Sequence, residues 1–213
     1  MTMFSRLVRI VPALALAATL AGCGINTIPT RDEQVKAAWG DVQNQYQRRA
    51  DLIPNLVNTV KGYAAQEKDV LTAVTEARAS ATQVRVDAST ITNPAQFQQY
   101  AAAQDKLSGV LGRLMMIQEN YPELKSNTNF LALQSQLEGT ENRISVARRD
   151  YNEAVRLYNT SLRTFPTVIW AKTLYGAQKP ALPFEAAATA QTAPTVSFDA
   201  TAPAAAPTPA PKQ

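Results

Sequence analysis

The stretch FLALQSQLEGTENRISVARRDYNEAVRLYNTSLRTF, residues 130–165, decides the fold of this chain. Every seventh residue in it is large and apolar: Phe130, Leu137, Ile144, Tyr151, Tyr158 and Phe165. A second row begins three residues later and is mostly small: Leu133, Thr140, Ala147, Ala154 and Ser161. The two rows predict an apolar stripe along one helix that a second helix can approach closely. Pro166 predicts the end of this helix, which would be about 50–55 Å long.

The preceding part of the chain has the same three-four spacing of apolar residues, so it can supply partners for the stripe. A first helix is expected from about residue 31 to Tyr63, with Thr30 and Glu33 forming a capping box at its start. Pro54 lies in the middle of this segment. It predicts either a kink or a division into two helices.

Two more helices complete the set, one over residues 67–85 and one from Pro94, capped by Asn93, to Tyr121. Long helices with such stripes predict an all-α fold, namely an up-and-down antiparallel four-helix bundle. The stretch 167–176 predicts a short amphipathic helix that packs across the end of the bundle. Contact of this helix with a membrane is the alternative.

The first 22 residues have the features of a secretion signal. Arg6 and Arg9 precede an apolar run over 10–21 that is too short to span a bilayer comfortably. The run ends in LAGC at 20–23, which resembles the lipobox of bacterial lipoproteins. That resemblance implies cleavage before Cys23 and acylation of its thiol and new amino group, which would hold the protein firmly at a membrane. An ordinary signal peptide with an incidental cysteine is the alternative.

These features divide the chain into a signal peptide over 1–22, a lipidated tether over 23–30 and a helical-bundle domain over 31–176. Residues 177–213 form a tail rich in Pro, Ala and Thr, which we expect to be largely disordered from about residue 185. The residue after Cys23 is a glycine rather than an acidic residue. This favours the outer over the inner membrane, with the protein facing the periplasm.

The composition excludes several classes of catalytic site. The chain contains no histidine and one cysteine, so it cannot form a Ser–His–Asp triad, a His-bearing metal site or an intrachain disulfide. No segment resembles a nucleophile elbow or a phosphate-binding glycine loop. We therefore expect a protein that is not an enzyme and that carries no cofactor or metal.

Charged and amide side chains gather on the first helix and on the long helix. Arg49 occupies a position in the apolar stripe, where a buried charge requires a partner such as Glu138, Glu141 or Asp150. We expect an inter-helix polar network with these candidates: Arg48, Arg49, Asp51, Glu138, Glu141, Asn142, Arg148, Arg149, Asp150 and Asn152. An exposed basic patch that binds an anionic polymer or lipid head group is the alternative, and the secretion signal argues against nucleic acid.

Several blocks of the sequence resemble the LemA family. They are DEQVKAAW at 32–39, QRRADLIPNLV at 47–57, LEGTENRI at 137–144, ARRDYN at 147–152, YN at 158–159 and FP at 165–166. The resemblance covers about residues 26–175. It implies an antiparallel helical bundle displayed outside the cytoplasmic membrane, and it brings no established activity, cofactor or catalytic residue. Many relatives keep an uncleaved N-terminal membrane helix, whereas Cys23 here implies a lipid anchor.

The sequence as a whole favours a lipid-anchored bundle in the cell envelope with a non-catalytic binding or scaffolding role. Its expected partners are the bacterial membrane, through Cys23, and another envelope protein; formation of a homo-oligomer is left open. One alternative is a carboxylate-based metal protein or hydrolase that uses Glu138, Glu141 and Asp150. Another is an amphipathic membrane-remodelling protein that uses residues 167–175.

Overall fold

A computed structural model describes residues 24–84, 86–87 and 89–185. Within these ranges the chain is all-α and contains no strand. Its longer helices are α2 (Thr27–Tyr63), α3 (Lys68–Gln83), α4 (Pro94–Met116) and α6 (Thr128–Ser161). The short elements are the 3-10 turns η1 (Thr90–Thr92) and η2 (Ile117–Asn120) and the helices α5 (Pro122–Lys125) and α7 (Thr167–Thr173). The predicted signal peptide, Cys23 and the tail from residue 186 lie outside the described residues.

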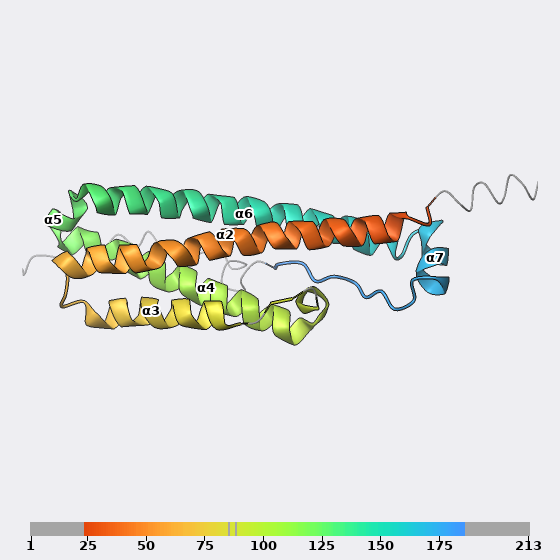
Figure 1. Cartoon of the computed structure of the whole chain (residues 1–213), viewed down its shortest axis with the longest axis horizontal. Helices are drawn as coiled ribbons and strands as arrows, with labels where there is room; N and C mark the ends of the chain where they lie inside the picture. The colour runs from red at the N-terminus through yellow and green to blue at the C-terminus, as the bar shows by residue number, and fades with distance from the viewer. Residues whose placement is uncertain (1–23, 85, 88, 186–213) are drawn as a thin grey trace, which may run out of the picture.

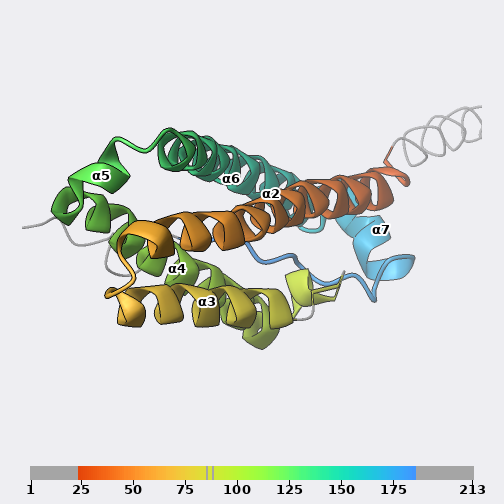
Figure 2. The same cartoon turned by 60° about the vertical axis from the view of Figure 1, so that its left-hand side comes forward.

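The helices form a long pair and a short pair (Figures 1 and 2). Helices α2 and α6 have 37 and 34 residues and pack against each other over most of their length, with opposite chain directions. Helix α3 has only 16 residues and packs on α4, which has 23. The all-α prediction is confirmed. Since α3 is less than half as long as α2, other segments cover the end of the long pair near α7.

The predicted stripe on the long helix is buried as far as the helix extends. Phe130, Leu137, Ile144, Tyr151 and Tyr158 are each 5% exposed or less. The last member of the row, Phe165, is 81% exposed because α6 ends at Ser161, before the predicted end of the helix. In the row of small residues Thr140 and Ser161 are buried, whereas Ala147 and Ala154 are half-buried.

Helix α2 is continuous through Pro54, so the division into two helices that the sequence left open does not occur. The helix begins at Thr27, inside the segment expected to be a tether. The capping box expected at Thr30 and Glu33 is therefore wrong, since Thr30 already lies within the first turns. Ile28 explains the earlier start, because its side chain is fully buried in the core and holds the first turn in place.

Helix α4 begins where the predicted capping residue Asn93 places it. The Asn93 side chain accepts hydrogen bonds from the backbone N–H groups of Ala95 and Gln96 at 3.2 and 3.4 Å, and Pro94 is the first residue of α4. Asn127 caps α6, which begins at Thr128: the Asn127 side chain accepts a hydrogen bond from the Phe130 N–H at 2.9 Å. Helix α4 ends at Met116 rather than at Tyr121, and η2 continues the chain from there.

The core consists of two clusters, one toward each end of the long pair. The cluster toward α5 is mainly aliphatic, with residues such as Leu56, Val74, Leu107 and Phe130. The cluster toward α7 is aromatic and contains Trp39, Phe97, Tyr100, Tyr151 and Phe184. Helix α7 lies across this end of the molecule beside the start of α2 (Figure 1).

Candidate functional site

The predicted polar network is centred on Arg49 of α2, whose side chain is 1% exposed. Its Nη1 donates to Glu141 Oε1 of α6 at 3.0 Å and to Ser108 Oγ of α4 at 2.6 Å. Its Nη2 donates to Gln104 of α4, at 2.6 Å to Oε1 and at 3.2 Å to the backbone oxygen. Arg49 is therefore paired with one of the three carboxylates expected, and Gln104 and Ser108 join the network unforeseen.

This guanidinium links three helices at one level of the bundle. A buried charge requires a countercharge and hydrogen-bond acceptors, and only one alignment of α2, α4 and α6 supplies all of them. The Arg49 carbon Cζ also lies 5.0 Å from the centre of the Tyr46 ring, a cation–π geometry. Arg49 Nε has no hydrogen-bond partner among the described residues. Helices α2, α4 and α6 are thus bonded to one another through Arg49.

Most other candidates do not join this network. Arg48 and Asn142 are exposed. Asp51 and Glu138 are also exposed, and they accept hydrogen bonds from Gln47 and Gln134 of their own helices at 2.8 and 2.9 Å. Arg149 and Asp150 form an exposed ion pair with each other at 3.0 Å. The ten candidates thus divide into one buried centre, a set of solvated residues, and two residues that contact a different part of the chain.

Those two residues, Arg148 and Asn152, hold the segment 177–185, which returns from α7 along the bundle (Figure 1). Asn152 Oδ1 accepts from the Phe184 N–H at 2.8 Å, and Asn152 Nδ2 donates to the Phe184 oxygen at 2.9 Å. Asn159 makes the same pair of bonds with Ala181, at 3.0 and 2.8 Å. Arg148 lies over the Phe184 ring, with Cζ 4.5 Å from its centre.

The two asparagines match the repeat of an extended chain. Asn152 and Asn159 are seven residues apart on α6, which corresponds to about 10.5 Å along the helix. Ala181 and Phe184 are three residues apart, which corresponds to about 10 Å in an extended segment. Because each amide has one donor and one acceptor side, it satisfies both backbone groups of the residue it faces. Helix α6 therefore holds segment 177–185 through its backbone.

Aromatic packing completes this attachment. The Phe184 ring lies 4.9 Å from Phe97, 5.5 Å from Tyr151 and 5.8 Å from Trp39, measured between ring centres. The Tyr151 hydroxyl donates to the Leu182 oxygen at 2.8 Å, and the Leu182 N–H donates to the Ile91 oxygen at 2.8 Å. Ala181 and Phe184 are thus part of the core, although segment 177–185 was assigned to the tail; its other residues are half-buried or exposed. The sequence signal that could have identified it is the pair of large apolar residues at 182 and 184 on either side of Pro183.

Burial changes the acidity of the tyrosines in the core. Burial, with a smaller contribution from the nearby Asp32, raises the pKa of Tyr158 to about 12. Burial also raises the pKa of the other tyrosines of this region, Tyr46, Tyr100 and Tyr151. These phenols are neutral at physiological pH, and the hydroxyls of Tyr151 and Tyr158 donate to the oxygens of Leu182 and Lys179.

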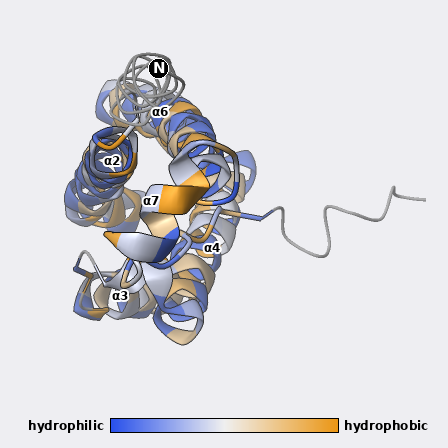
Figure 3. Ribbon diagram, turned by 90° about the vertical axis from the view of Figure 1, so that its right-hand side faces the viewer, coloured by the Kyte–Doolittle hydropathy of each residue, from blue (hydrophilic) through white to orange (hydrophobic). Residues whose placement is uncertain are grey.

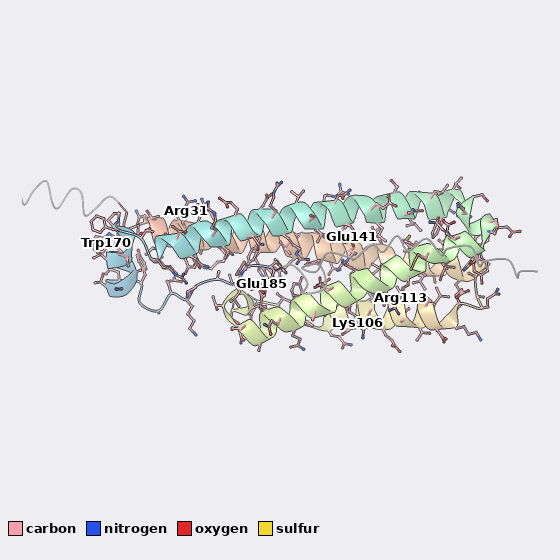
Figure 4. The ribbon with its side chains drawn as sticks, turned by 180° about the vertical axis from the view of Figure 1, so that it is seen from behind. Arg31, Lys106, Arg113, Glu141, Trp170 and Glu185 are labelled. Carbon is pink, nitrogen blue, oxygen red and sulfur yellow. The ribbon has the colours of Figure 1, made fainter. Side chains whose placement is uncertain are left out.

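A groove lies between α4 and α6, above the Arg49 centre. It has a volume of about 480 Å³. Apolar side chains of Leu111, Met115 and Leu137 line it together with the carboxylates of Glu138 and Glu141. Figure 4 shows Glu141 in the middle third of the molecule, away from the end that carries Trp170. Two of the predicted candidates are therefore walls of a surface hollow, and Asn142 is a third.

The same carboxylates do not gather into a metal centre. Within the described ranges, no three side chains of His, Cys, Asp or Glu lie close enough to hold a metal ion together. Glu138, Glu141 and Asp150 instead bond separately to Gln134, Arg49 and Arg149. None of the helices in the described part is long and apolar enough to cross a membrane.

The amino-acid sequence is similar to those of three curated proteins and matches one family model. The chain is 25% identical over 175 residues to the magnetosome proteins MamQ 1 and MamQ 2 of Paramagnetospirillum magneticum, covering 75% of this chain and 64% of each relative. It is 23% identical over 142 residues to protein LemA of Metamycoplasma hominis, covering 67% of this chain and 61% of that protein. The chain therefore spans less than two thirds of the length of these curated relatives. The sequence model of the LemA family matches residues 38–198, well over half of the chain, and the protein belongs to the LemA family.

Proposed function

We propose that this protein is a lipid-anchored module of the cell envelope, an up-and-down four-helix bundle that binds another envelope protein and has no catalytic role. The lipobox-like LAGC at 20–23 supports the lipid anchor, and membership of the LemA family supports a bundle displayed outside the cytoplasmic membrane. The similarity to magnetosome proteins supports association with a membrane-bounded compartment. The glycine after Cys23 favours the outer membrane and a periplasm-facing bundle.

The interior polar groups are hydrogen-bonded within the protein, which supports a binding role over a catalytic one. Arg49 has its guanidinium bonded to Glu141, Gln104 and Ser108, and Asn152 has both sides of its amide bonded to Phe184. Groups bonded in this way hold the bundle together. The Arg49 cation also occupies the position at Glu141 that a metal ion would need, which disfavours the carboxylate-based metal protein or hydrolase. The working surface is then the outside of the bundle.

The single observation that carries the proposed function is the groove between α4 and α6. Its walls combine the apolar side chains of Leu111, Met115 and Leu137 with the carboxylates of Glu138 and Glu141. Methionine adapts to the shape of a bound apolar surface, and the exposed carboxylate of Glu138 attracts basic side chains, whereas Glu141 is already paired with Arg49. We therefore propose that the partner inserts a segment that has apolar residues on one side and Lys or Arg beside them.

Site-specific photo-crosslinking in intact cells tests this proposal. A photoreactive amino acid replaces Asn142, an exposed residue on the wall of the groove. The matched control replaces Glu76, an exposed residue of α3 that does not line the groove. We expect one recurrent crosslinked protein from position 142 and none from position 76. The absence of any crosslink at 142, or the same products from both positions, would contradict the proposed binding surface.

A further inference from the structure

Three large apolar side chains are exposed within ten residues around α7. Phe165 is 81% exposed, Leu174 59% and Ile169 48%. Viewed from this end, α7 lies across the bundle and turns apolar residues outward (Figure 3). The opposite end of the bundle also exposes apolar side chains, including Met116 and Leu131. Exposure alone therefore does not distinguish the two ends.

The position of the N-terminal segment does distinguish them. Gly24 lies against the start of α7, since a Cβ built on it would be 3.5 Å from Thr167 Cγ2 and 3.9 Å from Pro166 Cγ. Residue 23 is bonded to Gly24, so the two Cα atoms are only about 3.8 Å apart. Whatever holds Cys23 at a lipid surface therefore brings the α7 end of the bundle to that surface. Figure 4 shows Arg31 and Trp170 together at this end.

The charge of this region fits an anionic surface. Between Glu153 and Glu185 the chain contains no carboxylate side chain, but it contains four cations: Arg156, Arg163, Lys172 and Lys179. Arg156 pairs with Glu153, whereas Arg163, Lys172 and Lys179 are exposed around α7. Anionic head groups attract lysine and arginine side chains that lie within a Debye length of the membrane, which is about 8 Å.

We propose that the α7 end of the bundle rests on the lipid surface, with Phe165, Ile169 and Leu174 among the head groups and the surrounding cations on anionic lipid. This inference rests on the lipid anchor of the proposed function and gives the anchored protein an orientation. Helix α2 then stands away from the membrane. Its 37 residues place the opposite end of the bundle about 55 Å from the lipid, and the groove between α4 and α6 faces the space between.

The test uses the mature, full-length protein reconstituted in vesicles of phosphatidylglycerol and phosphatidylcholine whose acyl chains carry bromine next to the head groups. Bromine quenches tryptophan on contact, and Trp170 is half-buried on α7. Flotation of the vesicles reports the anchor, and loss of emission reports contact of Trp170 with lipid. Trp39, the other tryptophan, is 3% exposed. It lies on α2, about 20 Å along that helix from its start at the α7 end. We expect the bound protein to lose the Trp170 part of its emission, and a Trp170→Phe variant to show no further quenching.

Two triple variants separate the proposed contact from a general apolar effect. Substitution of Phe165, Ile169 and Leu174 by Ser should abolish the quenching while the protein still floats with the vesicles. Substitution of Met116, Leu131 and Val146 by Ser, which removes apolar side chains elsewhere, should leave the quenching unchanged. All six residues are exposed, so the bundle retains its core in both variants.

The two readouts keep the possible failures apart. A protein that floats without any quenching of Trp170 overturns the membrane contact of the α7 end and leaves the anchor intact. A protein that neither floats nor is quenched overturns both the anchor and the orientation. Quenching that persists in the Trp170→Phe variant also overturns the proposal, because the signal would then come from Trp39 in the core.

Discussion

Removing the carboxylate partner of Arg49 should destabilise the bundle more than removing Arg49 itself. In a Glu141→Ala variant the guanidinium, which is 1% exposed, keeps only the neutral acceptors Gln104 and Ser108. Loss of one partner of a fully buried ion pair costs about 3–5 kcal/mol. The Glu141 side chain is 39% exposed, so water reaches its position and reduces the effect. We expect the free energy of unfolding to fall by about 3 kcal/mol.

An Arg49→Met variant removes the buried charge and nearly preserves the volume. Glu141 then returns to water, whereas the Ser108 hydroxyl and the amide and backbone oxygens of Gln104 lose the Arg49 donor, at a cost of about 1–2 kcal/mol. The double variant should resemble Arg49→Met alone, because Glu141 has no charge left to balance. The two changes are therefore strongly coupled, and the double-mutant cycle measures the coupling.

Urea denaturation followed by circular dichroism gives these free energies for the chain that begins at Gly24, which contains both core clusters in full. Glu153→Ala is the matched control, since it breaks an exposed ion pair on the same helix and should cost less than about 1 kcal/mol. The reasoning is refuted if Arg49→Met is the more destabilising of the two substitutions, or if their effects simply add.

The remaining predictions concern segment 177–185, the tyrosines and the anchor. Phe184→Ala should lower the free energy of unfolding by about 3–5 kcal/mol, whereas Phe165→Ala, at a residue that is 81% exposed, should change it by less than about 0.5 kcal/mol in the same assay. Asn152→Ala should increase hydrogen exchange at the Phe184 amide, and unchanged protection there would contradict the role given to the asparagines. Because burial raises the pKa of the core tyrosines above that of the unfolded chain, stability should be constant below about pH 10 and fall as the pH rises further, by about 1.4 kcal/mol per pH unit for each tyrosine; a melting temperature unchanged up to pH 12 would show otherwise. Mass spectrometry of the protein recovered from cells should show attached acyl chains that are missing from the Cys23→Ser variant. A mass difference no larger than the substitution itself would exclude lipidation at this residue.

The heptad rows were informative because a helix that buries one stripe constrains every third or fourth residue. The row from Phe130 to Tyr158 is buried throughout, and the Asn93 cap precedes a helix where the sequence placed it. Such signals are local, since each depends on residues within a few turns of one another. The ends of helices were less accurate. Helix α2 begins at Thr27 rather than after Thr30. Ile28 is buried against residues that are distant in the sequence, and this burial outweighs the local capping preference.

The sequence also identified Arg49 as a charge in an apolar stripe, and hence that it needed partners. It could not choose Glu141 over Glu138 or Asp150, because the three carboxylates differ in which side of α6 they occupy relative to α2. Asn152 was assigned to the network of Arg49, but it bonds to Phe184 instead. That bond joins residues 32 positions apart, and no local sequence pattern predicts that the chain turns back between them.

The sequence by itself therefore determined the all-α class, the family, the stripe on the long helix and the need to neutralise Arg49. These follow from spacing and composition, which act along one helix. The tertiary structure decided that Ala181 and Phe184 of segment 177–185 pack into the core and that Gly24 lies against α7. Both depend on matching two distant surfaces: the repeat of two asparagines on α6 equals three residues of extended chain, and the start of α2 meets the end of α6 only after the helices pack.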